Sequence, residues 1–265
     1  MKTSIGFMPL LGCIFAIHVK AQNITYLDLV DPTVSTVAID SGIFHAEILP
    51  GTSGTGNFDT FLRINGSPTA HGYNTSAKGV LDNLRGPWTH DITVGDMSVV
   101  QDLTGRYLIS VGLDLNEPNA EGARYKSLDA FQVYVSPIGS QSTTNPGELG
   151  RLVYDMDALR DHSILLDVNR NSSGGSGRSD LNIYLDIRLF EGAKQSDYLY
   201  FYMKTGGVML GEAPQYPTYS FASDGGFDEL RREYSILANT SVPEPGTVML
   251  WLLAATGFTA KRSRR

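Results

Sequence analysis

Oxygen-bearing side chains gather where turns are expected, and they could bind a hard cation. Asp114, Asn116 and Glu117 follow a run of alternating residues, and Asp155 is followed by Asp157. Carboxylate and amide oxygens in loops are the ligands that Ca²⁺ prefers, although no run here has the EF-hand spacing. A structural calcium site is therefore one hypothesis, and turn capping is the simpler one. The remaining candidate ligands are Asn119, Glu121, Asp224 and Asp228.

The side chains needed for hydrolysis are present but form no catalytic motif. The chain has no His-Glu-x-x-His sequence, which marks many zinc proteases. Residues 174–177 lack the spacing of a Gly-x-Ser-x-Gly nucleophile elbow. Two carboxylates facing each other across a cleft could hydrolyse a glycosidic bond, so a glycan-acting enzyme is an alternative to the non-catalytic protein that we expect. The candidates for these chemistries are the histidines His45, His71, His90 and His162 and the acids Asp114, Glu117, Asp155 and Asp157.

Aromatic residues in expected loops offer a second kind of site, one that binds sugars. Trp88 is the only tryptophan of the body, and Tyr73, Tyr125 and Tyr216 lie near turn residues. An exposed ring can stack on a sugar face, although most aromatic side chains fill the core instead. The sequence therefore allows a polysaccharide-binding module.

The elements that must position these residues are strands. Glycine is abundant, with 28 in 265 residues, helix-period patterns are scarce, and short β-branched or aromatic runs recur between turn clusters. This pattern is typical of an all-β protein. We expect an antiparallel β-sandwich of jelly-roll type over residues 23–240, flanked by an N-terminal signal peptide and a C-terminal hydrophobic helix. The expected strands cover residues 34–39, 43–49, 58–64, 107–115, 128–135, 164–168, 181–190, 198–203 and 227–237.

Some of these strands carry finer expectations. In residues 128–135, alternation places Asp129, Phe131, Val133 and Val135 on the core face. The aromatic run of residues 198–203 is expected at the centre of a sheet. Residues 227–237 are expected to form a strand, with a short helix as the alternative.

The last twenty-five residues have three parts with different physical properties. Pro243 and Pro245 fix the backbone around Glu244 and remove two N–H donors, so this stretch should be extended. An apolar run follows over residues 247–260, and it is short for a membrane span. Four basic residues close the chain, and such residues stay on the cytoplasmic side of an apolar segment. These basic residues are Lys261, Arg262, Arg264 and Arg265.

This tail resembles the PEP-CTERM sorting signal of exported bacterial proteins. The resemblance rests on Val242, Pro243, Glu244 and Pro245, on the apolar run and on the basic end. It implies that an exosortase, a membrane processing enzyme, recognises the Pro-Glu-Pro motif of residues 241–265. The body, in segments such as residues 85–90 and 127–135, also resembles exported proteins with this tail, a class that implies a location but no activity.

The N-terminus has the pattern of an export signal. Lys2 precedes an apolar region over residues 5–19, and Val19 and Ala21 occupy the positions that signal peptidase reads. We expect a signal peptide over residues 1–22, with cleavage between Ala21 and Gln22. A lipobox ending at Cys13 is the rival interpretation. Cys13 is the only cysteine, so a processed chain has no disulfide.

The net charge of the chain limits the classes of partner that the protein is expected to bind. The net charge is −7, and removing both ends makes the body more acidic, because they carry most of their charge as Lys and Arg. An acidic surface argues against nucleic acid as a partner. We therefore expect a protein exported across the inner membrane by the secretion machinery, transiently anchored, then placed at the cell surface or in the matrix. Its expected partners are signal peptidase, an exosortase and exopolysaccharide; a calcium-stabilised structural adhesin is a further alternative.

Overall fold

The computed structural model describes residues 24–46, 59–84, 86–118, 123–170 and 179–233. These residues form two seven-stranded sheets and contain no α-helix. The only helical turns in this part of the chain are three short 3₁₀ segments, η1 (Val94–Asp96), η2 (Pro146–Glu148) and η3 (Ile187–Phe190). The all-β architecture expected from the sequence is therefore confirmed.

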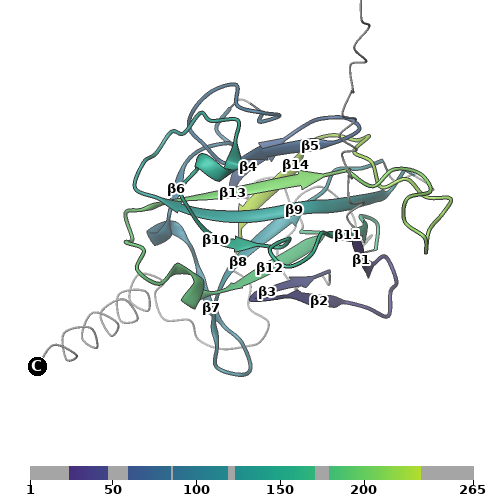
Figure 1. Ribbon diagram of the computed structural model, residues 1–265, viewed down its shortest axis with the longest axis horizontal. Helices are drawn as coiled ribbons and strands as arrows, with labels where there is room; N and C mark the ends of the chain where they lie inside the picture. The colour runs from purple at the N-terminus through teal and green to yellow at the C-terminus, as the bar shows by residue number, and fades with distance from the viewer. Residues whose placement is uncertain (1–23, 47–58, 85, 119–122, 171–178, 234–265) are drawn as a thin grey trace, which may run out of the picture.

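The first sheet is built around two long central strands, and its strand order is β1-β11-β9-β13-β5, with β10 paired to β9 and β6 to β13. Figure 1 shows β9 and β13 running along the length of the molecule. The central place of β13 confirms the expectation for the aromatic run. The strands are β1 (Thr25–Leu29), β5 (Ala70–Tyr73), β6 (Ile92–Thr93), β9 (Tyr125–Ser136), β10 (Arg151–Asp155), β11 (His162–Asp167) and β13 (Tyr198–Thr205).

The second sheet has the order β2-β3-β12-β8-β14-β4, with β7 paired to β8. Every strand pair in both sheets is antiparallel except β1 with β11, which is parallel. The expectation of a purely antiparallel sandwich is corrected at that one edge. The strands are β2 (Thr36–Ile39), β3 (Gly42–His45), β4 (Thr60–Ile64), β7 (Val99–Gln101), β8 (Tyr107–Asp114), β12 (Leu181–Asp186) and β14 (Asp228–Arg232).

The main core lies between the two sheets, because each sheet turns its apolar face toward the other. Phe44 of β3 and Phe131 of β9 meet edge to face at 6.2 Å between ring centroids. Phe61 of β4 and Phe201 of β13 meet at 5.3 Å. All four rings are fully buried, so aromatic pairs across the gap fix how the sheets stack.

Strand β9 changes its alternation part of the way along. Phe131 and Val133 point into the core as expected, but Asp129 has no partner in β13, where the register shifts between Lys204 and Thr205. This bulge exchanges the faces of the residues before it. Leu128 therefore lies in the core and Asp129 on the outer face, which corrects the strict alternation predicted for this strand.

Two further expectations can be judged here. The run of residues 181–190 is not one strand, because β12 ends at Asp186, whose side chain accepts from the backbone N–H of Arg188 and begins η3. Of the segment expected over residues 227–237, residues 228–232 form the strand β14 rather than a short helix, and residues 234–237 lie outside the described residues. The expected signal peptide and the tail of residues 241–265 also lie outside them. Within those that are described, no helix has the length and apolar character to cross a membrane.

Candidate ligand-binding site

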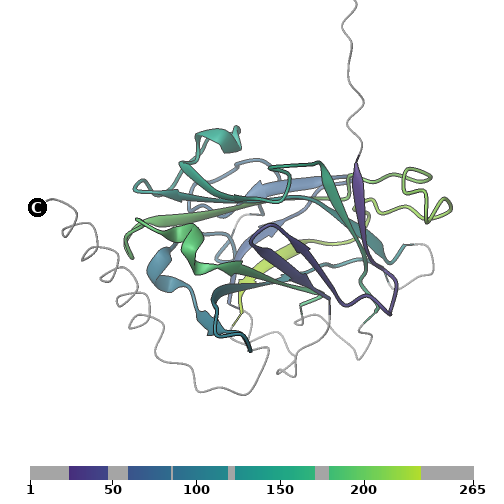
Figure 2. The same ribbon diagram turned by 60° about the horizontal axis from the view of Figure 1, so that its bottom comes forward.

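A cavity of about 530 Å³ opens at one end of the sandwich, where tyrosine rings meet charged side chains. The long loop between β13 and β14 forms one wall, and it projects from this end in Figures 1 and 2. The ends of β1 and β11 and the start of β9 form the rest. We call this cavity the tyrosine pocket; its lining residues are Val30, Asp31, Pro32, Arg124, Tyr125, Asp167, Asn169, Arg170, Tyr216 and Tyr219.

Three tyrosine rings lie nearly parallel in the pocket. Tyr219 stacks on Tyr125 with centroids 4.3 Å apart and an angle of 9° between the rings. Tyr216 stacks on Tyr219 at 5.4 Å and 8°. A turn positions the last two rings, since the backbone N–H of Tyr219 donates to the carbonyl of Tyr216 at 3.1 Å. Phe221 packs against both Tyr125 and Tyr216 from behind.

The outer two rings are anchored at opposite ends of the stack. The guanidinium of Arg124 lies 5.2 Å from the centroid of Tyr125, a cation–π contact. The Tyr216 hydroxyl donates to Asp28 Oδ2 at 2.8 Å. Burial raises the pKa of Tyr216, and the Asp28 carboxylate raises it further. Burial, followed by the neighbouring Tyr219 hydroxyl, likewise raises the pKa of Tyr125. Both hydroxyls are therefore neutral donors at physiological pH.

Charged groups border the rings. Arg124 forms an ion pair with Asp167 at 2.9 Å. Arg170 donates to the carbonyl oxygens of Leu29 and Val34 at 2.7 Å, which fixes the turn after β1. An ion pair and hydrogen bonds thus hold the walls of the pocket, which place flat apolar rings beside hydrogen-bonding groups. This is the combination with which proteins bind the apolar face and the hydroxyl groups of a sugar.

Of the four aromatic residues that the sequence suggested as sugar contacts, two line this pocket and two lie elsewhere. Tyr125 and Tyr216 converge here, although Tyr125 begins strand β9 rather than lying in a loop. Tyr73 is not in a loop either, because it ends β5 and is fully buried. Trp88 is 45% exposed and stands away from the pocket, over the guanidinium of Arg63. Tyr219 was missed.

The candidate calcium ligands do not form a metal site in the part of the chain that is described. That part contains no group of three or more His, Cys, Asp or Glu side chains able to hold a metal. Glu117 and Asp228, which the sequence placed in separate candidate groups, do meet, but they surround Lys126 Nζ at 2.5 and 2.8 Å. The ammonium group takes the position that a cation ligand set would enclose. Asn119 and Glu121 lie outside the described residues.

Asp155 and Asp157, the other candidate acids, accept hydrogen bonds from backbone N–H groups of the turn in which they lie. Asp155 Oδ1 accepts from the backbone N–H of Asp157 at 2.9 Å, and Asp157 Oδ1 accepts from that of His162 at 2.9 Å. Burial raises the pKa of Asp157 to about 6. The histidines are spread over both sheets, with His45 paired to Thr36 and His71 to Tyr202. These contacts support turn capping over catalysis.

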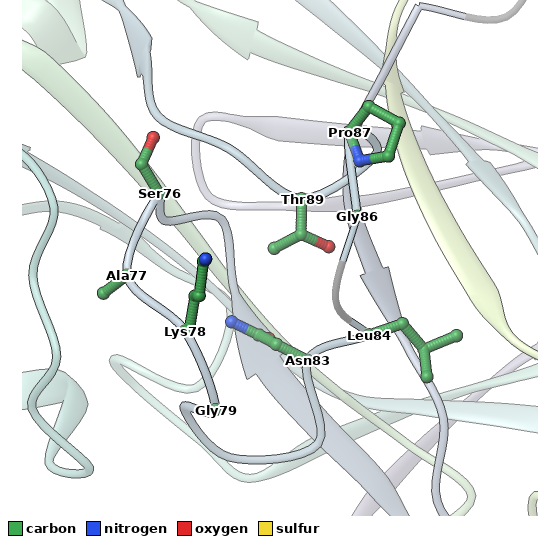
Figure 3. Close-up of a pocket in the computed structure, with 9 residues that line it drawn as sticks. All are labelled: Ser76, Ala77, Lys78, Gly79, Asn83, Leu84, Gly86, Pro87 and Thr89. Atoms are coloured by element: carbon green, nitrogen blue, oxygen red, sulfur yellow. The ribbon is translucent and has the colours of Figure 1, made fainter.

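A second cavity, of about 470 Å³, lies beside strand β5. Figure 3 shows residues 76–79 on one side and 86–89 on the other, with the side chains of Lys78 and Asn83 between them. Asn83 Nδ2 donates to the Tyr73 carbonyl at 2.7 Å, while its Oδ1 has no hydrogen-bond partner. This cavity contains one charged group and no aromatic ring among its lining residues, so it offers less to a ligand than the tyrosine pocket.

The residues expected to direct sorting lie outside the described residues. They comprise Ala21 and Gln22 at the N-terminus and Val242, Pro243, Glu244, Pro245, Lys261, Arg262, Arg264 and Arg265 in the tail. Comparison with known proteins gave no match to a family model, to a curated protein or to a solved structure.

Proposed function

We propose that this chain is an exported, non-catalytic protein of the cell surface or extracellular matrix, and that it binds polysaccharide in the tyrosine pocket. The observation that carries the binding proposal is the stack of Tyr125, Tyr219 and Tyr216 at the mouth of a rigid cavity. In this proposal the domain is a sandwich of jelly-roll type that presents the pocket at one end.

The chemistry of the pocket favours a sugar over a purely apolar ligand. The aromatic rings lie beside Arg124, Asp167 and Asn169, whose side chains can exchange hydrogen bonds with sugar hydroxyl groups. A wall of neutral tyrosines also suits an uncharged or weakly charged chain. Two carboxylates line this cavity, Asp31 and Asp167. Asp167 is held in an ion pair with Arg124, and Asp31 accepts hydrogen bonds from Thr33, which favours binding over hydrolysis.

The sorting part of the proposal rests on the sequence of the two ends. A signal peptide over residues 1–22 and the tail with Val242, Pro243, Glu244 and Pro245 would bring the chain to an exosortase. The basic cluster would hold the tail in the inner membrane until processing. The mature domain would then reach the cell surface or the surrounding polysaccharide.

The binding proposal is tested with the exported protein on an array of neutral and acidic bacterial exopolysaccharides. We expect binding to at least one glycan without release of reducing sugar. Tyr219→Ala should weaken that binding about tenfold, because it removes the middle ring of the stack. Trp88→Ala is the matched control, since it removes an exposed ring elsewhere. Equal losses for both variants would locate the site outside the pocket, and turnover would favour a glycan-acting enzyme.

The sorting proposal needs a separate experiment. Replacing Arg262, Arg264 and Arg265 by Ser, with Lys261 retained, should cause mis-sorting or full release of the protein. Intact-mass measurement of the exported wild-type chain should show cleavage after Ala21 and near Pro243. Unchanged fractionation of the variant would count against the sorting role of the basic cluster, and it would leave the binding proposal untouched.

A further inference from the structure

Three ionisable side chains meet between the two sheets, where water does not reach. Lys126 Nζ lies 2.8 Å from Asp228 Oδ1 and 2.5 Å from Glu117 Oε1. The exposed fractions of the side chains of Lys126, Asp228 and Glu117 are 0%, 1% and 0%. Lys126 extends inward from β9 of the first sheet, and Asp228 belongs to β14 of the second. Their contact therefore spans the sandwich.

The backbone around the two carboxylates is held in place. Thr205 Oγ1 donates to Asp228 Oδ2 at 2.7 Å, and the backbone N–H of Asn116 donates to the same carboxylate. Asn116 is bound in turn, because its carbonyl accepts from the Gly226 N–H at 2.8 Å. A side chain at Gly225 would collide with the Asn116 carbonyl and with Glu117. The segments that carry Glu117 and Asp228 are thus packed directly on each other.

A dry site favours neutral forms of these groups. Transfer of one proton from the Lys126 ammonium to Asp228 Oδ1 replaces that ion pair by an amine and a carboxylic acid, and Glu117 remains as the one carboxylate beside them. Burial raises the pKa of Asp228, in the direction that this transfer requires. Burial also raises the pKa of Glu117, which favours Glu117 as a proton acceptor in the reaction. An uncharged amine held against a carboxylic acid in fixed geometry is a nucleophile beside its electrophile.

We propose that Lys126 and Asp228 condense to an intramolecular isopeptide bond, with Glu117 as the acid–base catalyst. The lone pair of Lys126 Nζ attacks Asp228 Cγ, a C–N bond forms, and the C–Oδ1 bond breaks. Glu117 takes a proton from the attacking nitrogen and delivers it to the departing oxygen, which leaves as water. Nothing is oxidised or reduced. The Thr205 hydroxyl stabilises the negative charge that develops on Oδ2.

The contacts distinguish the carboxyl that reacts from the one that catalyses. Asp228 receives donors from Thr205 and Asn116, which polarise its carbonyl group. Glu117 Oε2 receives a weaker contact, from the Asp224 N–H at 3.3 Å, so Glu117 retains more freedom to exchange protons. The resulting bond would tie β9 to β14 and join the two sheets covalently. This inference concerns the core and is independent of the tyrosine pocket.

The test is peptide mapping of the full chain after denaturation. A lysine-specific protease cuts after a free lysine but not after an amide-linked one. We expect no cleavage between Lys126 and Ser127, and a linked peptide pair that contains Lys126 and Asp228 and is lighter than the two peptides by one water. Cleavage after Lys126, with both peptides at their unmodified masses, would overturn the proposal. A pair linked through Glu117 would overturn the assignment of roles.

Two variants and one control sharpen the result. Glu117→Gln should lower the rate of linkage by about 100-fold or more, because it removes the proton carrier. Asp228→Asn should give a linked pair of the same mass as the wild type, since ammonia replaces water as the leaving group; this variant keeps the test decisive if Glu117→Gln fails to fold. Glu229→Gln, at the next residue of β14, should link fully. Full linkage in Glu117→Gln would remove Glu117 from the reaction.

Discussion

Two consecutive residues of β14, Asp228 and Glu229, each pair with a cation, but on opposite faces of the sheet. Asp228 points between the sheets and meets Lys126, whose side chain is fully buried. Glu229 points to the other face, where it lies directly across from Arg63 of β4 and accepts from its Nε at 2.6 Å. Because side chains alternate along a strand, one carboxylate enters the core and its neighbour faces outward, where its side chain is still only 8% exposed and that of Arg63 15% exposed.

The type of cation matches each environment. Arg63 has its guanidinium 4.1 Å from the Trp88 centroid and 3.8 Å from that of Phe227, and a planar, permanently charged group suits such stacking. A lysine amine can lose its proton when it is buried, whereas a guanidinium does not. The inner pair can therefore react, and the outer pair can only attract. Burial and amine chemistry together, rather than charge pairing, distinguish the two.

The largest expected effect comes from removing the inner cation. Lys126→Met leaves two carboxylates in the core without a partner, which should lower the free energy of unfolding by about 3–5 kcal/mol. Loss of a covalent link that closes a loop of 102 residues should lower it by a further ~4.7 kcal/mol in the chain-entropy model. Urea denaturation followed by fluorescence measures both losses together.

The matched control for this variant is Lys78→Met. Lys78 is exposed, so its replacement should change the free energy of unfolding by less than about 0.5 kcal/mol. Glu117→Gln separates the two contributions of Lys126, because it prevents the link while retaining Lys126 beside Asp228. A Lys126→Met protein as stable as the wild type would show that the inner group stabilises nothing.

Much of the all-β fold could be predicted from the sequence. The errors of that prediction at Asp129 and after Asp186 have local causes. Period-two alternation predicted β8, and short apolar or aromatic runs predicted β11 and β13. Alternation failed in β9, where one extra residue, Asp129, reverses the faces. It also failed after Asp186, where a side-chain cap turns the chain although the residues that follow remain apolar. Bulges and caps depend on partners that are distant in sequence or on single hydrogen bonds, so alternation does not reveal them.

Only some residues of the two candidate sites could be predicted from the sequence. Tyr125 and Tyr216 were named as possible sugar contacts, but Tyr219 was missed, although a Pro at position 217 between two tyrosines is a signal for a turn that brings rings together. The acids Glu117 and Asp228 were each candidate cation ligands in separate groups, and their convergence on Lys126 was not predicted. Lys126 was overlooked because a lone lysine is usually solvent-exposed. Its position on the same face as Leu128, before the bulge at Asp129, was the missing information.

The outer pair should give a smaller effect than the inner one. Arg63→Met should lower the free energy of unfolding by about 2 kcal/mol, because Glu229 loses its partner on the outer face, where the 15% exposure of the Arg63 side chain lets water replace part of the contact. Arg63→Lys should recover about half of that loss, since the charge returns but the flat contact with Trp88 and Phe227 does not. Thermal or urea unfolding of both variants measures this. A loss as large as that of Lys126→Met would contradict the contrast between the two faces.

The smallest effect concerns a carboxyl that is partly buried without a lysine or arginine contact. Burial raises the pKa of Asp157 from 3.8 to about 6, with Asp155 and Asp161 adding to the rise, and a backbone hydrogen bond and charge from His162 opposing it. The folded chain therefore holds this proton at pH values where the unfolded chain has lost it. The stability contributed by Asp157 is full below pH 4 and is lost as the pH rises to about 6.

Asp157→Asn should remove this dependence. Its free energy of unfolding relative to the wild type should rise by about 1 kcal/mol between the acidic and neutral ends of that window, a value reduced for solvent screening of a partly exposed group. Urea titrations of both proteins across the window measure the difference. A difference that is flat with pH would mean that solvent reaches Asp157 freely. A difference of opposite slope would mean that His162, whose Nδ1 lies 3.9 Å from Asp157 Oδ1, dominates as a cation and makes this pair resemble Arg63 with Glu229.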